Sequence, residues 1–91
     1  MKKLSVVVSV YNEELSLDKF YQTAIKILEN CGWDYEIIFV NDGSIDKSIE
    51  ILTRFVKNNS NVKVVNFSRN FGHEAAMIAG IDYATGDGIV C

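Results

Sequence analysis

The sequence predicts an α/β domain in which helices cover both faces of a parallel β-sheet. Short apolar runs rich in β-branched residues alternate with segments whose apolar residues recur at helical spacing. Each intervening segment is long enough for a crossover helix, the connection that parallel strands require. No proline, internal repeat or low-complexity tract interrupts this alternation over the 91 residues. The predicted order is β-α-β-α-β-α-β, with right-handed crossovers.

The first strand and helix are predicted from residues 4–31. Leu4–Val10 is apolar at nearly every position, which is typical of a strand buried on both faces. The helix that follows has Asn12 as its candidate N-cap, acidic residues in its first turn and Gly32 as its candidate C′ residue. Its apolar positions are Leu17, Phe20, Tyr21, Ala24, Ile25, Leu28 and Cys31.

The second unit repeats this arrangement. Tyr35–Val40 predicts a buried strand, and the polar cluster Asn41–Ser44 predicts a turn after it. Ser44 and Asp46 are the two candidate caps of the next helix. Its apolar positions are Ile45, Ile49, Leu52, Phe55 and Val56.

The last part of the chain predicts a third unit and the start of a fourth strand. Val62–Phe67 is predicted to form the third strand and Ser68–Gly72 a loop. A third helix then starts at His73, has apolar positions between residues 75 and 83, and ends by Gly86. A fourth strand begins at residue 88, and Asp87 is expected to cap its start.

Length and charge exclude several classes of protein. Ninety-one residues are too few for a TIM barrel of ~250 residues, or for an enzyme whose site lies between two domains. Nine Lys and Arg against twelve Asp and Glu give a net charge of −3. Because the basic residues are scattered, no footprint for nucleic acid or an anionic membrane is predicted.

Cysteines and hydropathy indicate a soluble chain in the cytoplasm. Cys31 and Cys91 have no metal-type spacing, and one bridge would be a weak staple for a secreted miniprotein, so reduced thiols are expected. Two lysines precede an apolar run at the N-terminus, but that run is short and lacks a cleavage pattern. No stretch approaches the ~18 apolar residues of a membrane helix.

Candidate ligand-binding residues follow the predicted strands at their carboxyl ends, where open parallel sheets bind ligands. These ends carry Tyr11-Asn12-Glu13, Asn41-Asp42-Gly43-Ser44 and Ser68-Arg69-Asn70. Two acids, an amide-rich turn and an arginine on one rim suit a ligand with a base, a sugar and phosphates. In this interpretation Asp42 accepts hydrogen bonds from a base, Gly43 permits close backbone approach, and Arg69 contacts a base or phosphate.

Each of these groups also has a purely structural interpretation. Asn12 and the acids after it can cap the first helix, and Asp42-Gly43-Ser44 can be a simple turn. Arg69 can be an ordinary surface arginine. His73 can be a helix-terminal residue, and no second His or Cys stands beside it at the spacing of a zinc site.

Several familiar signatures are absent from the sequence. It has no G-x-G-x-x-G after the first strand, no P-loop and no G-x-S-x-G elbow. The third strand ends Phe67-Ser68-Arg69, without the Asp that a receiver-type phosphoacceptor would need. The usual dinucleotide, NTPase and serine-hydrolase sites are therefore disfavoured.

Three blocks of the sequence form a recognisable pattern: residues 6–14, residues 40–46, and residues 67–76 with 79–80. Together they resemble the family 2 inverting nucleotide-sugar glycosyltransferases. The third block most resembles the branch that transfers a sugar to polyprenyl phosphate, such as dolichol-phosphate mannosyltransferase and the undecaprenyl-phosphate enzymes. The resemblance runs from Leu4 to Cys91 and implies a Rossmann-like sheet. In this interpretation residues 1–91 are the nucleotide-binding N-terminal half of a GT-A domain.

The resemblance also implies roles for individual residues. Tyr11 and Glu13 would line the base and ribose pocket, Asp42 would bond the base, and Arg69 would help to hold the nucleotide. Gly43 and Ser44 would shape the loop. The wall beside it would be ordered by Asn70, Gly72 and His73.

The sequence departs from the family pattern at three places. The family usually has proline where this chain has Ser9, and often Asp where it has Asn41. Its Asp-x-Asp motif, which holds Mg²⁺ or Mn²⁺ on the diphosphate, would begin just after Cys91. We therefore expect a chain that ends before the metal ligands, with no catalytic residue of its own.

The function implied by the resemblance is sugar transfer from a UDP- or GDP-sugar, with polyprenyl phosphate as the expected acceptor. The nucleotide base, the sugar and the acceptor stay open at this stage. Attachment to the cytoplasmic face of the membrane would depend on further segments, and the edge of the fourth strand could pair two copies. The alternative is a non-catalytic nucleotide-sensing or protein-interaction module, which a natural stop codon directly after Cys91 would favour.

Overall fold

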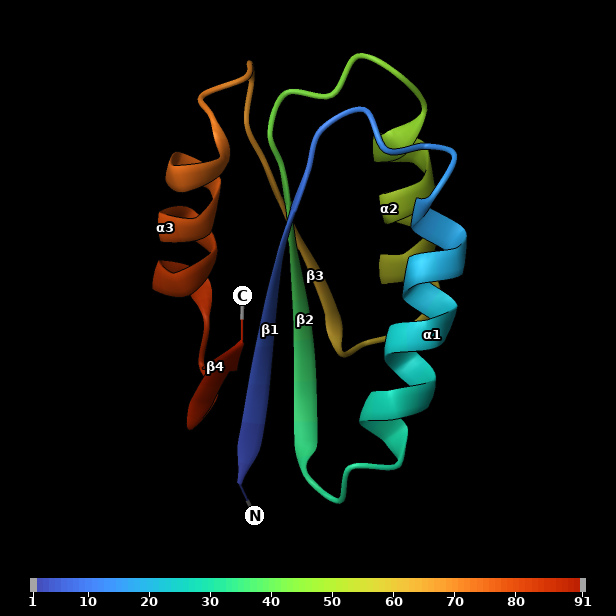
Figure 1. The fold of residues 1–91 in the computed structure, drawn as a ribbon, viewed down its shortest axis with the longest axis vertical. Coiled ribbons are helices and arrows are strands. Elements are labelled where there is room, and N and C mark those ends of the chain that lie inside the picture. The colour runs from blue at the N-terminus through green and yellow to red at the C-terminus, as the bar shows by residue number, and fades with distance from the viewer. Residues whose placement is uncertain (1, 91) are drawn as a thin grey trace.

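The computed structural model describes residues 2–90 and has the predicted β-α-β-α-β-α-β order (Figure 1). Its strands and helices are β1 (Lys3–Val10), α1 (Leu17–Glu29), β2 (Asp34–Asn41), α2 (Ser48–Asn58), β3 (Val62–Asn66), α3 (His73–Tyr83) and β4 (Gly88–Val90). Cys91 lies outside the described residues, and Cys31 is an exposed free thiol.

The four strands form one parallel sheet in the order β3-β2-β1-β4. β1 pairs with β2 along its whole length, whereas β4 pairs only with residues 4–6 of β1. The chain moves outward from β1 to β2 and β3, and then returns to place β4 on the other side of β1. The strand order therefore reverses at β1, and the carboxyl end of β1 is where a ligand is expected.

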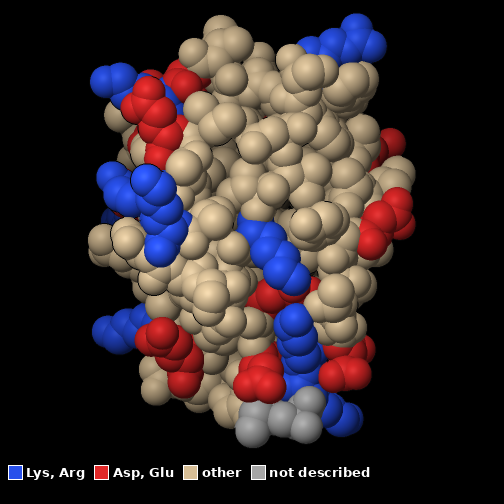
Figure 2. Space-filling view, turned by 180° about the vertical axis from the view of Figure 1, so that it is seen from behind, with Lys and Arg blue, Asp and Glu red and all other residues tan. Residues whose placement is uncertain are grey.

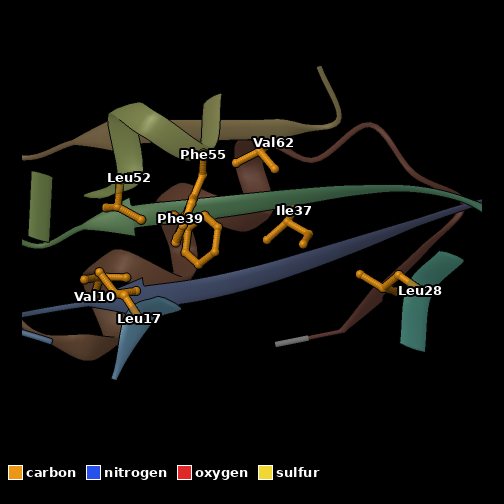
Figure 3. Packing of buried hydrophobic residues seen from close by; sticks show 8 residues of the cluster. All are labelled: Val10, Leu17, Leu28, Ile37, Phe39, Leu52, Phe55 and Val62. Carbon is orange, nitrogen blue, oxygen red and sulfur yellow. The ribbon is translucent and has the colours of Figure 1, made fainter. Parts of the chain in front are cut away.

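Helices lie on both faces of the sheet, as predicted: α1 and α2 cover one face and α3 the other (Figure 1). Alternate β2 side chains serve the two cores, because successive strand residues point to opposite faces. The core under α1 and α2 is shown in Figure 3 and contains Val10, Leu17, Leu28, Ile37, Phe39, Leu52, Phe55 and Val62. The core under α3 contains Val7, Ile38, Val40 and Ala76.

A glycine allows α3 to lie close to the sheet. A Cβ atom at Gly80 would lie 2.2 Å from the Cγ1 atom of Val7 and 3.1 Å from the Cγ2 atom of Val40. Because Gly80 has no side chain of its own, the helix backbone packs directly on the side chains of Val7 in β1 and Val40 in β2. This contact sets the position of α3, including its first residue at the carboxyl edge of the sheet.

The predicted start of the first helix is wrong. α1 begins at Leu17 with Ser16 before it, and Asn12 has a left-handed backbone (φ 53°) outside the helix. The Oδ1 atom of Asn12 accepts a hydrogen bond from the N–H of Ile45 instead. At the other end Asn30 is the C-cap, so the C′ residue is Cys31, and Gly32 (φ 83°), which was predicted for that position, lies one residue farther on.

The second helix differs from the prediction at its start, whereas the third agrees with it. α2 begins only at Ser48, which leaves Ile45 outside it and 87% exposed. The N-cap of α2 is Lys47, so neither candidate cap occupies that position, although the Oδ1 atom of Asp46 accepts a hydrogen bond from the N–H of Ser48. α3 begins at His73, as expected, and ends at Tyr83.

Strand burial and strand ends also refine the expectations. β1 is not fully buried on both faces: Ser5, Val7 and Val10 are buried, and its other residues are half-buried. β3 ends at Asn66, one residue before the predicted end. Asp87 joins the start of β4 to β1, since its Oδ2 atom accepts a hydrogen bond from the N–H of Lys3 at 3.0 Å.

Acidic and basic side chains are intermingled on the face shown in Figure 2 and form no continuous basic patch there. Among residues 2–90, no helix combines the length and apolar character needed to cross a membrane.

Candidate functional site

Three loops meet at the carboxyl edge of the sheet. They are residues 11–16 after β1, 42–47 after β2 and 67–72 after β3, and they lie together at the top of Figure 1. Since all strands are parallel, their carboxyl ends must share one edge. The polar clusters singled out in the sequence are therefore neighbours in space.

Four hydrogen bonds join the loop after β2, together with the adjoining Ser48, to the loop after β1. In each bond a backbone N–H on one side donates to a side chain on the other. Three consecutive N–H groups of the β1 loop donate to side-chain oxygens of residues 44–48, and the side chain of Asn12 accepts in return. The four bonds are Asn12 N–H to Ser44 Oγ (3.0 Å), Glu13 N–H to Ser48 Oγ (2.9 Å), Glu14 N–H to Asp46 Oδ2 (3.2 Å) and Ile45 N–H to Asn12 Oδ1 (2.9 Å). These bonds consequently fix the backbone of the loop after β1.

Asp46 is the acidic member of this junction. Partial burial acts to raise the pKa of its carboxyl, but hydrogen bonds from Ser48 and from the N–H of Glu14 outweigh burial and lower the pKa below its ordinary value. The carboxylate therefore stays ionised and keeps accepting both bonds at neutral pH.

Asp42 holds the third loop from a buried position. Its Oδ1 atom accepts from the N–H of Phe71 at 2.8 Å. Its Oδ2 atom accepts from the N–H of Gly72 at 3.1 Å and from the Nδ2 atom of Asn70 at 3.2 Å. A carboxylate offers about four acceptor sites, so Oδ1 retains one for a further donor.

Gly43 permits a close backbone contact between the second and third loops. It has a left-handed backbone (φ 72°), and a Cβ atom there would lie 2.2 Å from the carbonyl carbon of Arg69 and 2.4 Å from the nitrogen of Asn70. Close approach was expected at this residue, and the group that approaches is the loop after β3.

A polar cavity of about 370 Å³ opens between the loops, beside the carboxyl end of β1. It brings together three of the predicted site residues, Tyr11, Glu13 and Asp42. The remaining lining residues are Ser9, Asn70, Gly72 and His73.

The other predicted site residues lie outside this lining. Gly43 and Ser44 support the loops, as described above. The guanidinium of Arg69 lies 4.7 Å from the ring centroid of Phe71, which in turn packs edge-on against Phe67. Arg69 therefore stacks on an aromatic ring of its own loop.

One lining residue was not predicted for the site: Ser9 appeared only as a departure from the family pattern. A polar residue near the end of a valine-rich strand is the signal that could have identified it. Asn70, Gly72 and His73 do lie along the wall where the resemblance placed them.

A second cavity adjoins the first on its apolar side. It measures about 570 Å³, and Ser9 and His73 line it as well. Its other lining residues are apolar: Val6, Val7, Val8, Phe20, Met77 and Val90. The chemistry-bearing side chains gather in the smaller polar cavity, which is therefore the candidate site.

Metal ligands were expected to lie beyond Cys91. Among residues 2–90, no group of three or more His, Cys, Asp or Glu side chains is placed to hold a metal ion.

A family model described as "Glycosyl transferase family 2" matches residues 5–91. The chain belongs to glycosyltransferase family 2. The resemblance carried by the three sequence blocks is thereby confirmed.

Curated relatives of this family 2 chain carry glycosyltransferase names. It is 50% identical over 86 residues to "Uncharacterized glycosyltransferase YkcC" of Bacillus subtilis, covering 94% of the chain and 27% of that relative. It is 42% identical over 88 residues to "Prophage bactoprenol glucosyl transferase homolog" of Escherichia coli, covering 97% of the chain and 29% of the relative. The chain thus spans less than a third of the length of these relatives. Bactoprenol is a polyprenol, so the second name agrees with the branch indicated by the third block.

Solved glycosyltransferase structures share the fold. The structure of Staphylococcus aureus TarS, residues 1–349, superposes with a TM-score of 0.83 and 25% identity, covering 96% of this chain and 26% of TarS. The mannosyltransferase PcManGT of Pyrobaculum calidifontis was solved in complex with GDP-Man and Mn²⁺. It superposes with a TM-score of 0.72 at 21% identity, covering 97% of this chain and 26% of PcManGT. The Rossmann-like half of a GT-A fold is thereby established for this family 2 chain.

Proposed function

We propose that this family 2 protein transfers a sugar from a UDP- or GDP-sugar to polyprenyl phosphate, and that residues 2–90 form the nucleotide-binding half of its GT-A domain. The observation that carries the proposal is the polar cavity at the carboxyl end of β1, where Tyr11, Glu13 and Asp42 converge. This is the place where an open parallel sheet reverses its strand order and binds its ligand.

The lining side chains suit the parts of a nucleotide. Tyr11 is 46% exposed, so its ring can stack on a base. Glu13 is exposed, and its Oε2 atom accepts one bond, from Ser16, which leaves acceptor sites for ribose hydroxyls. Asp42 retains one acceptor site at Oδ1 for a base N–H.

The reaction that fits these parts is a single displacement. A phosphate oxygen of the acceptor forms a bond to the anomeric carbon, and the bond from that carbon to the diphosphate breaks with its electron pair leaving on the nucleotide. A phosphate acceptor is already an anion at neutral pH, so it needs little help from a general base. The role of residues 2–90 is to hold and orient the donor.

A divalent cation, such as the Mn²⁺ in the Pyrobaculum structure, is part of the proposal for the whole protein. The described residues offer no cluster of ligands for it. The proposal accordingly assigns it no residue of this chain.

Calorimetric titration of the protein with UDP and with GDP tests the nucleotide site. We expect one of the two to bind, and Asp42→Ala to weaken its binding at least about tenfold, because it removes an acceptor for the base and frees the loop at residues 70–72. Asp34→Ala is the matched control: it makes the same change at the opposite end of β2, where the side chain is exposed. Equal affinities for wild type and Asp42→Ala would remove Asp42 from the site.

A further inference from the structure

Ser9 and His73 form a hydrogen-bonded pair between the two cavities. The Oγ atom of Ser9 lies 2.8 Å from the Nδ1 atom of His73. Ser9 is the penultimate residue of β1 and His73 the first residue of α3, and these two ends lie at the same edge of the molecule (Figure 1). Both residues line the polar cavity and the apolar cavity, so the pair is the wall that the two cavities share.

The hydrogen bond leaves one ring nitrogen of His73 for a ligand. Nδ1 is occupied by Ser9, and no other side-chain hydrogen bond is made by Nε2 within the described residues. A serine hydroxyl both donates and accepts. When Ser9 donates to Nδ1, the neutral ring carries its proton on Nε2, and when the ring is charged, Nδ1 donates to Ser9 and Nε2 again carries a proton. A ligand that only accepts hydrogen bonds selects these two states.

The charges around the cavity single out His73 as the group that can meet an anion. The two carboxylates that line the cavity, those of Glu13 and Asp42, are hydrogen-bond acceptors and carry the same sign of charge as a phosphate. Arg69 stacks on Phe71 outside the lining. Among the residues that line the polar cavity, only the side chain of His73 can carry a positive charge.

We propose that His73 binds the diphosphate of the donor through its Nε2–H and that Ser9 positions the imidazole for this contact. The inference rests on the proposed function and assigns His73 to the ligand itself, beyond its place in the wall.

The affinities of the full-length protein for UDP and uridine, and for GDP and guanosine, test the role of this pair when measured by competition binding. We expect His73→Ala to weaken binding of the preferred nucleoside diphosphate by about tenfold and to change nucleoside binding by less than about twofold. His73→Gln should recover part of the loss, because its amide can donate in place of Nε2–H.

The positioning role has its own matched variants. Ser9→Thr keeps the hydroxyl and should bind like wild type. Ser9→Val has nearly the same shape as that threonine variant but no hydroxyl, and it should lose several-fold of the diphosphate affinity. In the double variant, Ser9→Val should not lower the diphosphate affinity below that of His73→Ala alone, because both substitutions act through one contact.

The outcomes separate the two proposals. A wild-type protein that binds neither UDP nor GDP overturns the proposed function and this inference with it. Wild-type binding that His73→Ala leaves unchanged, or weakens equally for nucleoside and diphosphate, overturns only the inference.

Discussion

Two adjacent residues, Asp42 and Gly43, determine where the loop after β3 lies. Asp42 holds residues 70–72 by three hydrogen bonds from a buried carboxylate, and Gly43 leaves room for the backbone of Arg69 and Asn70. Neither role requires a ligand. Asp42 and Gly43 therefore stabilise the loop after β3 at the same place where a nucleotide is proposed to bind.

Gly43→Ala should destabilise the protein and disturb the polar cavity. The left-handed backbone costs a non-glycine residue about 1–2 kcal/mol, and the Cβ atom would collide with the Arg69–Asn70 backbone, which adds roughly another 1–3 kcal/mol. Urea unfolding measures the loss, and UDP or GDP titration measures the effect on the cavity.

Gly32→Ala is the matched control for this substitution. Gly32 also has a positive φ (83°), but nothing lies within 4 Å of the Cβ position. The free energy of unfolding of Gly32→Ala should fall only by the cost of placing alanine in a left-handed backbone. Its nucleotide affinity should equal that of the wild type. Equal losses of stability in the two variants would show that the contact with the third loop is unimportant.

At the scale of elements, the buried carboxylate of Glu36 joins three strands and the turn after α3. It accepts hydrogen bonds from Ser5 of β1 (2.6 Å), Lys63 of β3 (2.7 Å) and the N–H of Thr85 (2.7 Å). Burial alone raises the pKa of this carboxyl, but these hydrogen bonds outweigh burial and lower the pKa to about 2.

This network predicts a loss of stability in acid. The folded-state pKa of about 2 lies below the unfolded value of 4.5, so the stabilisation is complete above pH 4.5 and disappears as the pH falls toward 2. Urea unfolding should show a decrease of roughly 2 kcal/mol in the free energy of unfolding between pH 7 and pH 3 from this group.

Glu36→Gln removes the titrating group and serves as the comparison. It should be less stable than wild type at pH 7, because an amide cannot accept all these bonds, and its stability should depend less on pH by the same amount. Parallel pH profiles for the two proteins would contradict the assignment.

The sequence predicts the element order and the shared polar edge, but it does not predict where the first two helices begin. Asn12, Ser44, Asp46 and Ser48 are all residue types that cap helices. In the structure, side chains of residues 44–48 accept from N–H groups of a loop 32 to 35 residues away. A local pattern cannot distinguish a side chain that caps its own helix from one that binds a distant loop.

The same limit applies to the site residues. Tyr11, Glu13 and Asp42 follow strands directly, and the strand order alone brings them together. Arg69 was expected to contact the nucleotide, but the placement of its side chain depends on the ring of Phe71 two residues later. Ser9 enters the site through its bond to His73, 64 residues away, which periodicity does not reveal.

At the scale of the whole molecule, the strand order and the three loops form one unit. The order β3-β2-β1-β4 places the reversal at β1, and the β2 loop connects the loops on either side of the polar cavity. A ligand in that cavity contacts residues from all three loops, so its binding should stabilise the loops together. The amino edge of the sheet has no part in this coupling.

Hydrogen exchange with and without saturating UDP or GDP, followed by mass spectrometry, tests this account most directly. We predict slower exchange in residues 9–16, 41–48 and 68–75 together, and unchanged exchange at the amino edge in residues 31–34 and 85–88. Protection confined to the amino edge, or no protection of the three loops at saturating nucleotide, would contradict the assignment of this edge as the nucleotide site.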